Sequence, residues 1–233
     1  MRIIVDVMGG DNAPRETTLG AFAAAKEFDP SIEYTLVGDE AAIREIAAAE
    51  GVDLARFDIV PTSEVITMED DPVCVMRAQK ESSMSTGLRM LAEGKGDAFV
   101  SAGSTGALLT GATLLVKRVK GIRRAAMGPW MPTKTGGKVV ICDCGANAEC
   151  TSEFLLQFAL LGSLYSRKNL GVENPRVGLL NIGTEDSKGT PLQKEAYALL
   201  TAAAERGILN FVGNVEARDV PLGAVDVVVC DGF

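Results

Sequence analysis

The 233-residue chain has 23 Lys and Arg against 31 Asp and Glu, a formal net charge of −8, and 47% of its residues are hydrophobic. The acidic balance argues against non-specific nucleic-acid binding, which needs an excess of positive charge. The apolar content, with 25 glycines and only 5% aromatic residues, is typical of α/β proteins and excludes a disordered or fibrous chain. We expect a single α/β domain over residues 1–233.

The first residues and the apolar runs indicate a cytoplasmic protein. The chain opens directly into the strand-like residues 3–6, without the basic and apolar regions of a signal peptide. The longest apolar runs, 107–116 and 154–164, are shorter than the ~18 residues of a membrane span.

The chain has five cysteines and no histidine. An odd cysteine count without an export signal is typical of free thiols rather than of a disulfide framework. Because the spacing of Cys142, Cys144 and Cys150 fits no zinc module, we interpret the cysteines as small buried hydrophobic residues, and we expect neither a metal nor a cofactor. The missing histidine excludes Ser-His-Asp and Cys-His nucleophile pairs within these residues.

Strand-like and helix-like segments alternate along the chain. We expect strands at 2–5, 33–37, 57–60, 98–100, 138–142, 176–180, 210–212 and 226–230. We expect helices at 14–28, 39–51, 82–94, 107–116, 152–165 and 190–207. Such alternation implies right-handed crossovers, so we predict a three-layer fold with a mostly parallel sheet and helices on both faces. The helix at 152–165 is apolar almost all round, as in a buried helix or a subunit interface, so we predict a homodimer.

Residues 97–107, DAFVSAGSTGA, pass from a strand through Gly-x-x-Gly into a helix. The unpaired backbone N–H groups at such a helix start attract anions, phosphate above all. An ordinary βα turn explains this single stretch equally well. Nearly every strand, however, ends in glycine and a short polar residue, and ligands of open α/β sheets bind at that edge. The turns are 6–11, 101–106, 143–147, 181–184, 213–214 and 231–232.

The ligand of these turns is not a dinucleotide or a nucleoside triphosphate of the usual kinds. No turn has the G-x-G-x-x-G pattern or the P-loop pattern, so inorganic phosphate or a phosphorylated small molecule fits better. Lys188 could supply the countercharge, whereas Lys80 is better explained as a solvated surface charge.

Motifs spread from end to end closely resemble those of the PlsX family, the bacterial phosphate:acyl-(acyl carrier protein) acyltransferases. They are VDVMGGD at 5–11 with Ala13-Pro14, DAFVSAG at 97–103, TGAL at 105–108, GAN at 145–147, RVGLLNIGTE at 176–185, Lys188-Gly189, GNVE at 213–216 and VVVCDGF at 227–233. Two positions differ from the usual family pattern: Asn12 replaces a histidine, and Ser104 replaces an asparagine, keeping a hydroxyl cap but reaching less far.

The resemblance implies a fold similar to the phosphotransacetylases and isopropylmalate dehydrogenases, and a homodimer. It implies transfer of a fatty acyl group from the thioester of acyl carrier protein to inorganic phosphate, giving acyl phosphate for phospholipid synthesis. It also implies a downstream membrane glycerol-phosphate acyltransferase and contact of the protein with the membrane surface. Since family members continue past the Asp-Gly-Phe motif, we expect a further C-terminal segment.

From the turns and the resemblance we predict the residues of the site. Lys188 would neutralise phosphate, and Asn147 or Asn214 would donate to the thioester oxygen. The predicted phosphate-binding and substrate-binding residues are Gly9, Gly10, Asp11, Ser101, Gly103, Ser104, Thr105, Gly106, Gly183, Thr184 and Asp231. Phosphate is already an anionic nucleophile at neutral pH, so the protein need only position it and stabilise the oxyanion.

A basic cluster stands out in this acidic chain: Lys117, Arg118, Lys120, Arg123 and Arg124. Cations are common at a helix C-terminus, but five within eight residues exceed that need. We predict a docking patch for the acidic acyl carrier protein.

Aspartates at the strand ends do not fit phosphate binding easily. Asp6, Asp11, Asp143 and Asp231 could hold loops through backbone N–H groups, pair with Lys188, or bind Mg²⁺. The last option leaves a Mg²⁺-dependent hydroxy-acid dehydrogenase of the same fold as an alternative function, disfavoured by the missing dinucleotide pattern. A non-catalytic scaffold that binds a phospho-ligand is the other alternative.

Overall fold

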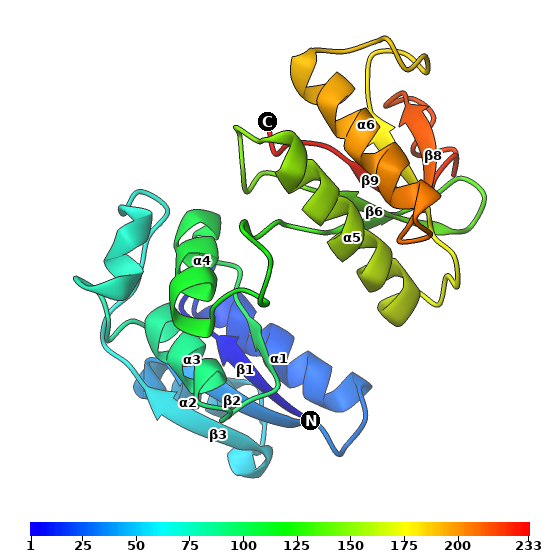
Figure 1. Ribbon diagram of the computed structural model, residues 1–233. Helices are drawn as coiled ribbons and strands as arrows, with labels where there is room; N and C mark the ends of the chain where they lie inside the picture. Colours follow the sequence, from blue (N-terminus) through cyan, green and yellow to red (C-terminus); the bar gives the residue numbers. More distant parts are fainter. The chain divides into compact units, whose positions relative to one another are not determined.

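The computed structural model describes residues 1–233 as two compact units, Met1–Val119 and Lys120–Phe233. We call them unit 1 and unit 2; each has its own sheet and its own core (Figure 1). The predicted α/β class with mostly parallel pairing is therefore confirmed, with the strands shared between two sheets. The single domain over residues 1–233 stays a prediction.

Unit 1 contains a four-stranded sheet of order β3-β2-β1-β4, in which all neighbours are parallel. Its strands are β1 Arg2–Asp6, β2 Glu33–Gly38, β3 Phe57–Pro61 and β4 Ala98–Val100. Its helices are α1 Arg15–Glu27, α2 Glu40–Ala49, α3 Ser83–Ala92 and α4 Thr105–Gly111, with 3₁₀ turns at Leu54–Arg56 and Pro72–Met76. One apolar cluster joins the sheet to α1 and α2, and a second joins α3, α4 and the 3₁₀ turn at Pro72–Met76, so unit 1 is layered as predicted.

Polar side chains begin three of these helices. Asp39 accepts from the N–H groups of Ala41 and Ala42 at 2.9 and 3.2 Å, and Ser82 caps α3. Ser104 caps α4, as predicted, by accepting from the N–H of Ala107 at 3.3 Å. The helix expected at 107–116 starts two residues earlier and ends in a π-helical segment, Ala112–Val116.

Unit 2 contains a five-stranded sheet of order β5-β6-β9-β7-β8. Its strands are β5 Trp130–Pro132, β6 Lys138–Cys142, β7 Arg176–Leu180, β8 Asn210–Val215 and β9 Val227–Val229, and its helices are α5 Ser152–Asn169 and α6 Pro191–Glu205. Only β5, which has no counterpart among the strands expected from sequence, runs antiparallel to its neighbour. Helices α5 and α6 pack on one face, while Val220 and Val225 from the loop after β8 pack on the other.

Helix α5 is apolar on most sides but not fully buried. Leu155 and Phe158 lie in the core, whereas Leu164 and Tyr165 remain 45% and 39% exposed. The helix therefore leaves an apolar strip uncovered in unit 2. No helix of the structure is both long enough and apolar enough to cross a membrane.

An ion pair joins the start of β7 to the start of β9. Arg176 donates to both carboxylate oxygens of Asp226 at 3.0 Å and also to the carbonyls of Gly223 and Ala224. Burial alone would raise the pKa of Asp226, but the hydrogen bonds from Arg176 outweigh it and hold that pKa below its ordinary value of 3.8.

This depressed pKa predicts an acid-dependent loss of stability. A carboxyl with a lowered folded-state pKa stabilises the fold above its unfolded-state pKa, and the contribution disappears as the pH falls through the folded-state pKa. We expect the free energy of unfolding to fall below about pH 4 less steeply in Asp226→Asn than in the unmodified chain. Urea unfolding measured between neutral and acidic pH tests this, and parallel pH profiles would contradict it.

Candidate functional site

The carboxyl ends of β1 and β4 meet at one edge of the unit 1 sheet, because these strands are parallel neighbours. Asp6, at the end of β1, is 1% exposed. One of its oxygens accepts from the N–H groups of Met8 and Gly9, both at 3.1 Å, and the other accepts from the Ser101 hydroxyl at 2.7 Å. The same hydroxyl accepts from the Gly103 N–H at 3.1 Å. Asp6 therefore ties the two glycine turns together.

The turns approach each other so closely that Gly9 has no room for a side chain. A Cβ at Gly9 would lie 2.5 Å from an Asp6 oxygen and 2.9 Å from the Gly103 nitrogen. The backbone of Gly10 adopts φ +127°, a region that favours glycine. Both glycines are thus required by the geometry of the turn itself.

Some N–H groups of these turns are already used and others have no protein acceptor. Those of Gly9 and Gly103 are bonded to Asp6 and Ser101. Those of Gly10, Thr105 and Gly106 have no partner within the protein. The predicted anion-binding turns therefore keep donors for a ligand, these three among them, while Asp11 lies exposed beside them.

Unit 2 repeats this construction at the end of β6. Asp143 is 1% exposed and accepts hydrogen bonds from the N–H groups of Met127 at 2.8 Å, Ala146 at 3.3 Å and Asn147 at 2.7 Å, and from the Asn147 side chain at 2.8 Å. The end of β9 lies against this turn, since a Cβ at Gly232 would be 2.7 Å from the Asn147 nitrogen. Among the roles considered for Asp6 and Asp143, the structure shows the holding of loops.

The two asparagines predicted as donors differ in how they are bound. The Asn147 amide nitrogen donates to Asp143 and, at 2.8 Å, to the carbonyl of Ala125, so a catalytic role would require it to exchange one of these bonds. The Asn214 nitrogen donates to the Glu185 carbonyl at 2.7 Å, and the buried Asn214 oxygen has no partner. Asn214 is thus the residue with unused hydrogen-bonding capacity.

Lys188 lies in the loop between β7 and α6, where the side chains of Asn181 and Asn214 hold the backbone. Asn181 donates to the Lys188 carbonyl at 3.2 Å, and the Asn214 amide holds the carbonyl of Glu185. Gly183 is a buried residue of the same loop, and a Cβ there would lie 3.2 Å from the Lys188 side chain. Lys188 itself is exposed and forms no ion pair.

Thr184 and Asp231 belong to the same edge of the unit 2 sheet. Thr184 is exposed in the loop of Lys188, and Asp231 is half-buried at the end of β9. Asn181 holds this loop but was not among the predicted residues; its position directly after a buried strand was the available signal. The sequence-predicted residues therefore gather in two groups, one in each unit.

Two cysteines near this edge, Cys142 and Cys230, are poor nucleophiles. Burial, followed by the charges of nearby aspartates, raises the pKa of both Cys142 and Cys230 to about 12, so both remain thiols at neutral pH. No group of three or more Cys, Asp or Glu side chains in the structure is arranged to hold a metal ion.

The basic cluster spans the point in the chain where unit 1 ends and unit 2 begins. Lys117 and Arg118 end unit 1, and Lys120, Arg123 and Arg124 begin unit 2. Arg123 pairs with Glu153 in the first turn of α5 at 2.7 Å, and the Arg124 guanidinium lies 5.6 Å from the centre of the Phe154 ring.

Solved structures with a similar fold include phosphotransacetylases and dehydrogenases. A phosphotransacetylase from Streptococcus pyogenes matches with TM-score 0.73 and 20% identity over 100% of this chain and 78% of its own. The EutD phosphotransacetylase from Staphylococcus aureus matches with TM-score 0.67 and 20% identity over 97% and 76%. A putative 4-hydroxythreonine-4-phosphate dehydrogenase from Salmonella typhimurium matches with TM-score 0.59 and 14% identity over 97% and 80%. At these identities the matches show the fold alone, and they confirm the predicted fold class.

Relatives of known name are much closer in sequence. The phosphate acyltransferase of Acetivibrio thermocellus is 49% identical over 233 residues, which are 100% of this chain and 67% of that protein. The phosphate acyltransferase of Brevibacillus brevis is 50% identical over 100% of this chain and 68% of its own length. A family model described as fatty acid synthesis protein matches residues 1–233. The prediction of an acyltransferase is thereby confirmed at the level of the family. The chain belongs to the fatty acid synthesis protein family, as its resemblance to the PlsX motifs predicted.

Proposed function

We propose that the protein transfers a fatty acyl group from the thioester of acyl carrier protein to inorganic phosphate, forming acyl phosphate. The observation that supports this most is the match, over the whole chain, to phosphate acyltransferases at 49% and 50% identity. The alternatives of a dehydrogenase and of a non-catalytic scaffold have no comparable support.

The reaction needs little proton transfer from the protein. A phosphate oxygen attacks the thioester carbonyl carbon, the C–O bond forms, and the tetrahedral oxyanion collapses as the C–S bond breaks. The thiolate that leaves takes a proton from water. What the protein supplies is positioning of the phosphate and stabilisation of the oxyanion.

Each unit, described by itself, offers groups suited to these tasks. In unit 1, the N–H groups of Gly10, Thr105 and Gly106, which have no protein acceptor, would bind phosphate oxygens. In unit 2, the unpaired Lys188 would offer its charge to an anionic substrate, and Asn214 would donate to the thioester oxygen with its second amide hydrogen. Asn147 would reach the same oxygen only by exchanging a bond it now makes.

The direct experiment is to incubate the protein with acyl carrier thioester and labelled phosphate and to trap acyl phosphate with hydroxylamine. We expect acyl hydroxamate only when both substrates are present. Phosphate binding without hydroxamate would favour the scaffold, and reduction of a nicotinamide cofactor by a hydroxy acid would favour the dehydrogenase.

We also propose that the basic cluster receives the carrier protein. Because the carrier protein is acidic, charge reversal at Arg123 and Arg124 to Glu should raise KM for the acyl donor by about tenfold at low salt. KM for phosphate should stay unchanged. Stability should change little, since the Arg123–Glu153 pair is solvent-exposed.

The matched control for this prediction is Lys194→Glu with Arg206→Glu, which makes the same change in net charge at exposed positions of α6 and just beyond its end. Steady-state kinetics of all three proteins at two salt concentrations make the comparison. Equal effects of the two double variants, or equal effects on both substrates, would contradict a docking role.

Two further parts of the proposal follow from the family resemblance. We propose that the protein acts as a homodimer, and that its acyl phosphate is used by a membrane glycerol-phosphate acyltransferase. Light scattering tests the dimer. A coupled assay with membranes that contain the glycerol-phosphate acyltransferase tests the use of acyl phosphate.

A further inference from the structure

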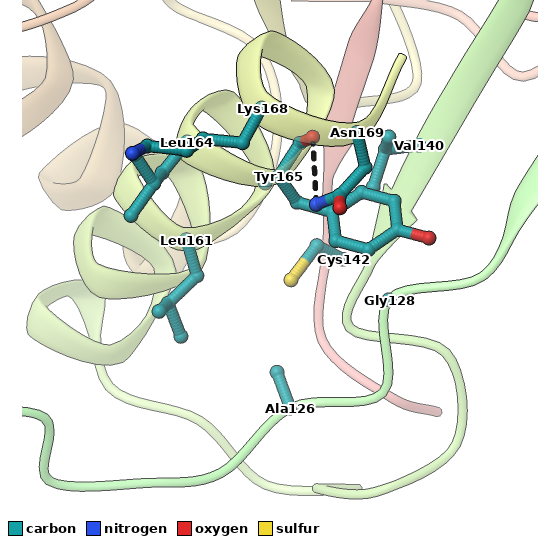
Figure 2. A pocket seen from close by; sticks show the side chains of 10 residues that line it. Ala126, Gly128, Val140, Cys142, Leu161, Leu164, Tyr165, Lys168 and Asn169 are labelled. Carbon is teal, nitrogen blue, oxygen red and sulfur yellow. Dashed lines mark hydrogen bonds between the residues drawn. The ribbon is translucent and has the colours of Figure 1, made fainter. Parts of the chain in front are cut away.

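Unit 2 contains an apolar groove that the site described above does not use. It has a volume of about 540 Å³ and is lined by residues of α5, of β6 and of the segment that precedes β5. Figure 2 shows the side chains of Leu161, Cys142 and Ala126 facing a common space. The volume is within the range of small-molecule pockets, about 300–1,000 Å³.

The lining of the groove suits a hydrocarbon chain. It is lined by Val140 and Cys142, which are 0% and 3% exposed, and by Leu164 and Tyr165 of α5. The Cys142 thiol stays neutral, because burial raises its pKa to about 12. The groove is lined along α5 by side chains from Leu161 to Lys168. These two residues are seven positions apart, so the groove extends over about 10 Å of the helix. The groove has little polar surface inside.

One end of the groove adjoins the turn that follows β6. Ala126 lines the groove, and both of its chain neighbours bond to that turn. Ala125 accepts from the Asn147 side chain at 2.8 Å, and Met127 donates to Asp143 at 2.8 Å. A chain that lies in the groove would therefore bring its Ala126 end to the carboxyl edge of the unit 2 sheet, where the candidate residues of this unit gather.

We propose that this groove binds the fatty acyl chain of the acyl donor, with the thioester end at Ala126 and the methyl end toward Lys168. The inference rests on the proposed acyl transfer and adds a chain-binding site to it. Each methylene that leaves water on binding raises affinity by about fourfold, so long chains should bind much more tightly than short ones.

Gly128 offers a way to fill the groove without disturbing the fold. A Cβ there would meet only Val140, at 4.0 Å, and the backbone of Gly128 is not in the left-handed region. Gly128→Leu should place its side chain where the acyl chain would lie. We expect it to weaken binding of palmitate by at least about tenfold, as measured by displacement of the fluorescent fatty acid cis-parinaric acid.

Gly20→Leu is the matched control. Gly20 also has open space where a Cβ would lie, and it lines a different apolar cavity, of about 370 Å³, in unit 1. Palmitate binding by Gly20→Leu should equal that of the unmodified protein. An equal loss in both variants would overturn the assignment to the unit 2 groove.

Kinetic measurements on the same variants separate this inference from the proposed function. With active enzyme, Gly128→Leu should raise KM for an octanoyl donor more than for a butanoyl donor and leave KM for phosphate unchanged. If palmitate binds and Gly128→Leu weakens it but no acyl phosphate forms, the groove stands and the proposed function fails. If acyl phosphate forms and Gly128→Leu alters neither binding nor KM, the groove is overturned and the function stands. A change of oligomeric state in Gly128→Leu, seen by light scattering, would assign the groove to a subunit contact and overturn the proposal.

Discussion

Lys188→Ala is expected to lower kcat/KM for acyl transfer by about 10²–10³-fold, which corresponds to about 3–4 kcal/mol of transition-state stabilisation. The side chain is exposed and forms no ion pair, so its charge is available to a ligand. Its backbone is nevertheless fixed, because Asn181 bonds to its carbonyl. A held backbone with an unpaired cation is the arrangement that an anionic substrate requires.

The measurement is the hydroxylamine assay at varied phosphate, with two controls. Lys188→Arg should restore part of the activity, since it keeps the charge but changes its geometry. Lys194→Ala removes an exposed lysine from the first turns of α6 and should leave kcat/KM unchanged. Near-normal turnover of Lys188→Ala would remove Lys188 from the proposed site.

The segments with a regular apolar pattern, and the caps and turns that bound them, were predictable from the sequence. Ser104 and Asp39 precede apolar runs and can accept N–H bonds, and the structure places both at helix starts. The buried strands β6 and β7 have their predicted bounds, since their runs of apolar residues end at turn residues. These features depend on residues that are close together in the chain, so a single sequence is enough to predict them.

The pairing between strands was harder to predict from the sequence. The alternation of strands and helices in the sequence does not show whether the strands form one sheet or two. The number of sheets depends on contacts between residues that are far apart in the chain. Strand β5 was missed for a related reason: three residues, Trp130–Pro132, make no pattern, and only their pairing with β6 makes them a strand.

The sequence directed attention to polar residues at the strand ends but did not decide their roles. Asp6 and Asp143 follow buried strands, and their position drew attention to them, but burial and hydrogen bonds decide between a loop anchor and a metal ligand. The same holds for Asn147, whose amide is as suited to a substrate oxygen as to the Ala125 carbonyl that it contacts. The groups that these side chains contact are determined by the fold, and the motif alone does not reveal them.

Asp143→Ala is expected to lower the free energy of unfolding by about 3–5 kcal/mol, because four donor groups would lose their acceptor inside the protein. The carboxylate is 1% exposed, so water cannot easily replace it. The loss should also loosen the Met127 segment, which this carboxylate ties to the turn together with the bond from the Asn147 side chain to the Ala125 carbonyl and the bond from the Cys144 N–H to the Met127 carbonyl. Urea unfolding followed by circular dichroism measures the effect.

Two variants show whether the anchor, and not the mere removal of an acid, causes this loss. Asp143→Asn keeps an acceptor oxygen but turns the other position into a donor that faces the N–H groups of Asn147, so an intermediate loss is expected. Asp186→Ala removes an exposed aspartate, and its unfolding should match that of the unmodified chain. If Asp143→Ala unfolds at the same urea concentration as Asp186→Ala, the carboxylate does not hold the turn. The N–H groups of Met127, Ala146 and Asn147 would then have found other acceptors in the folded chain.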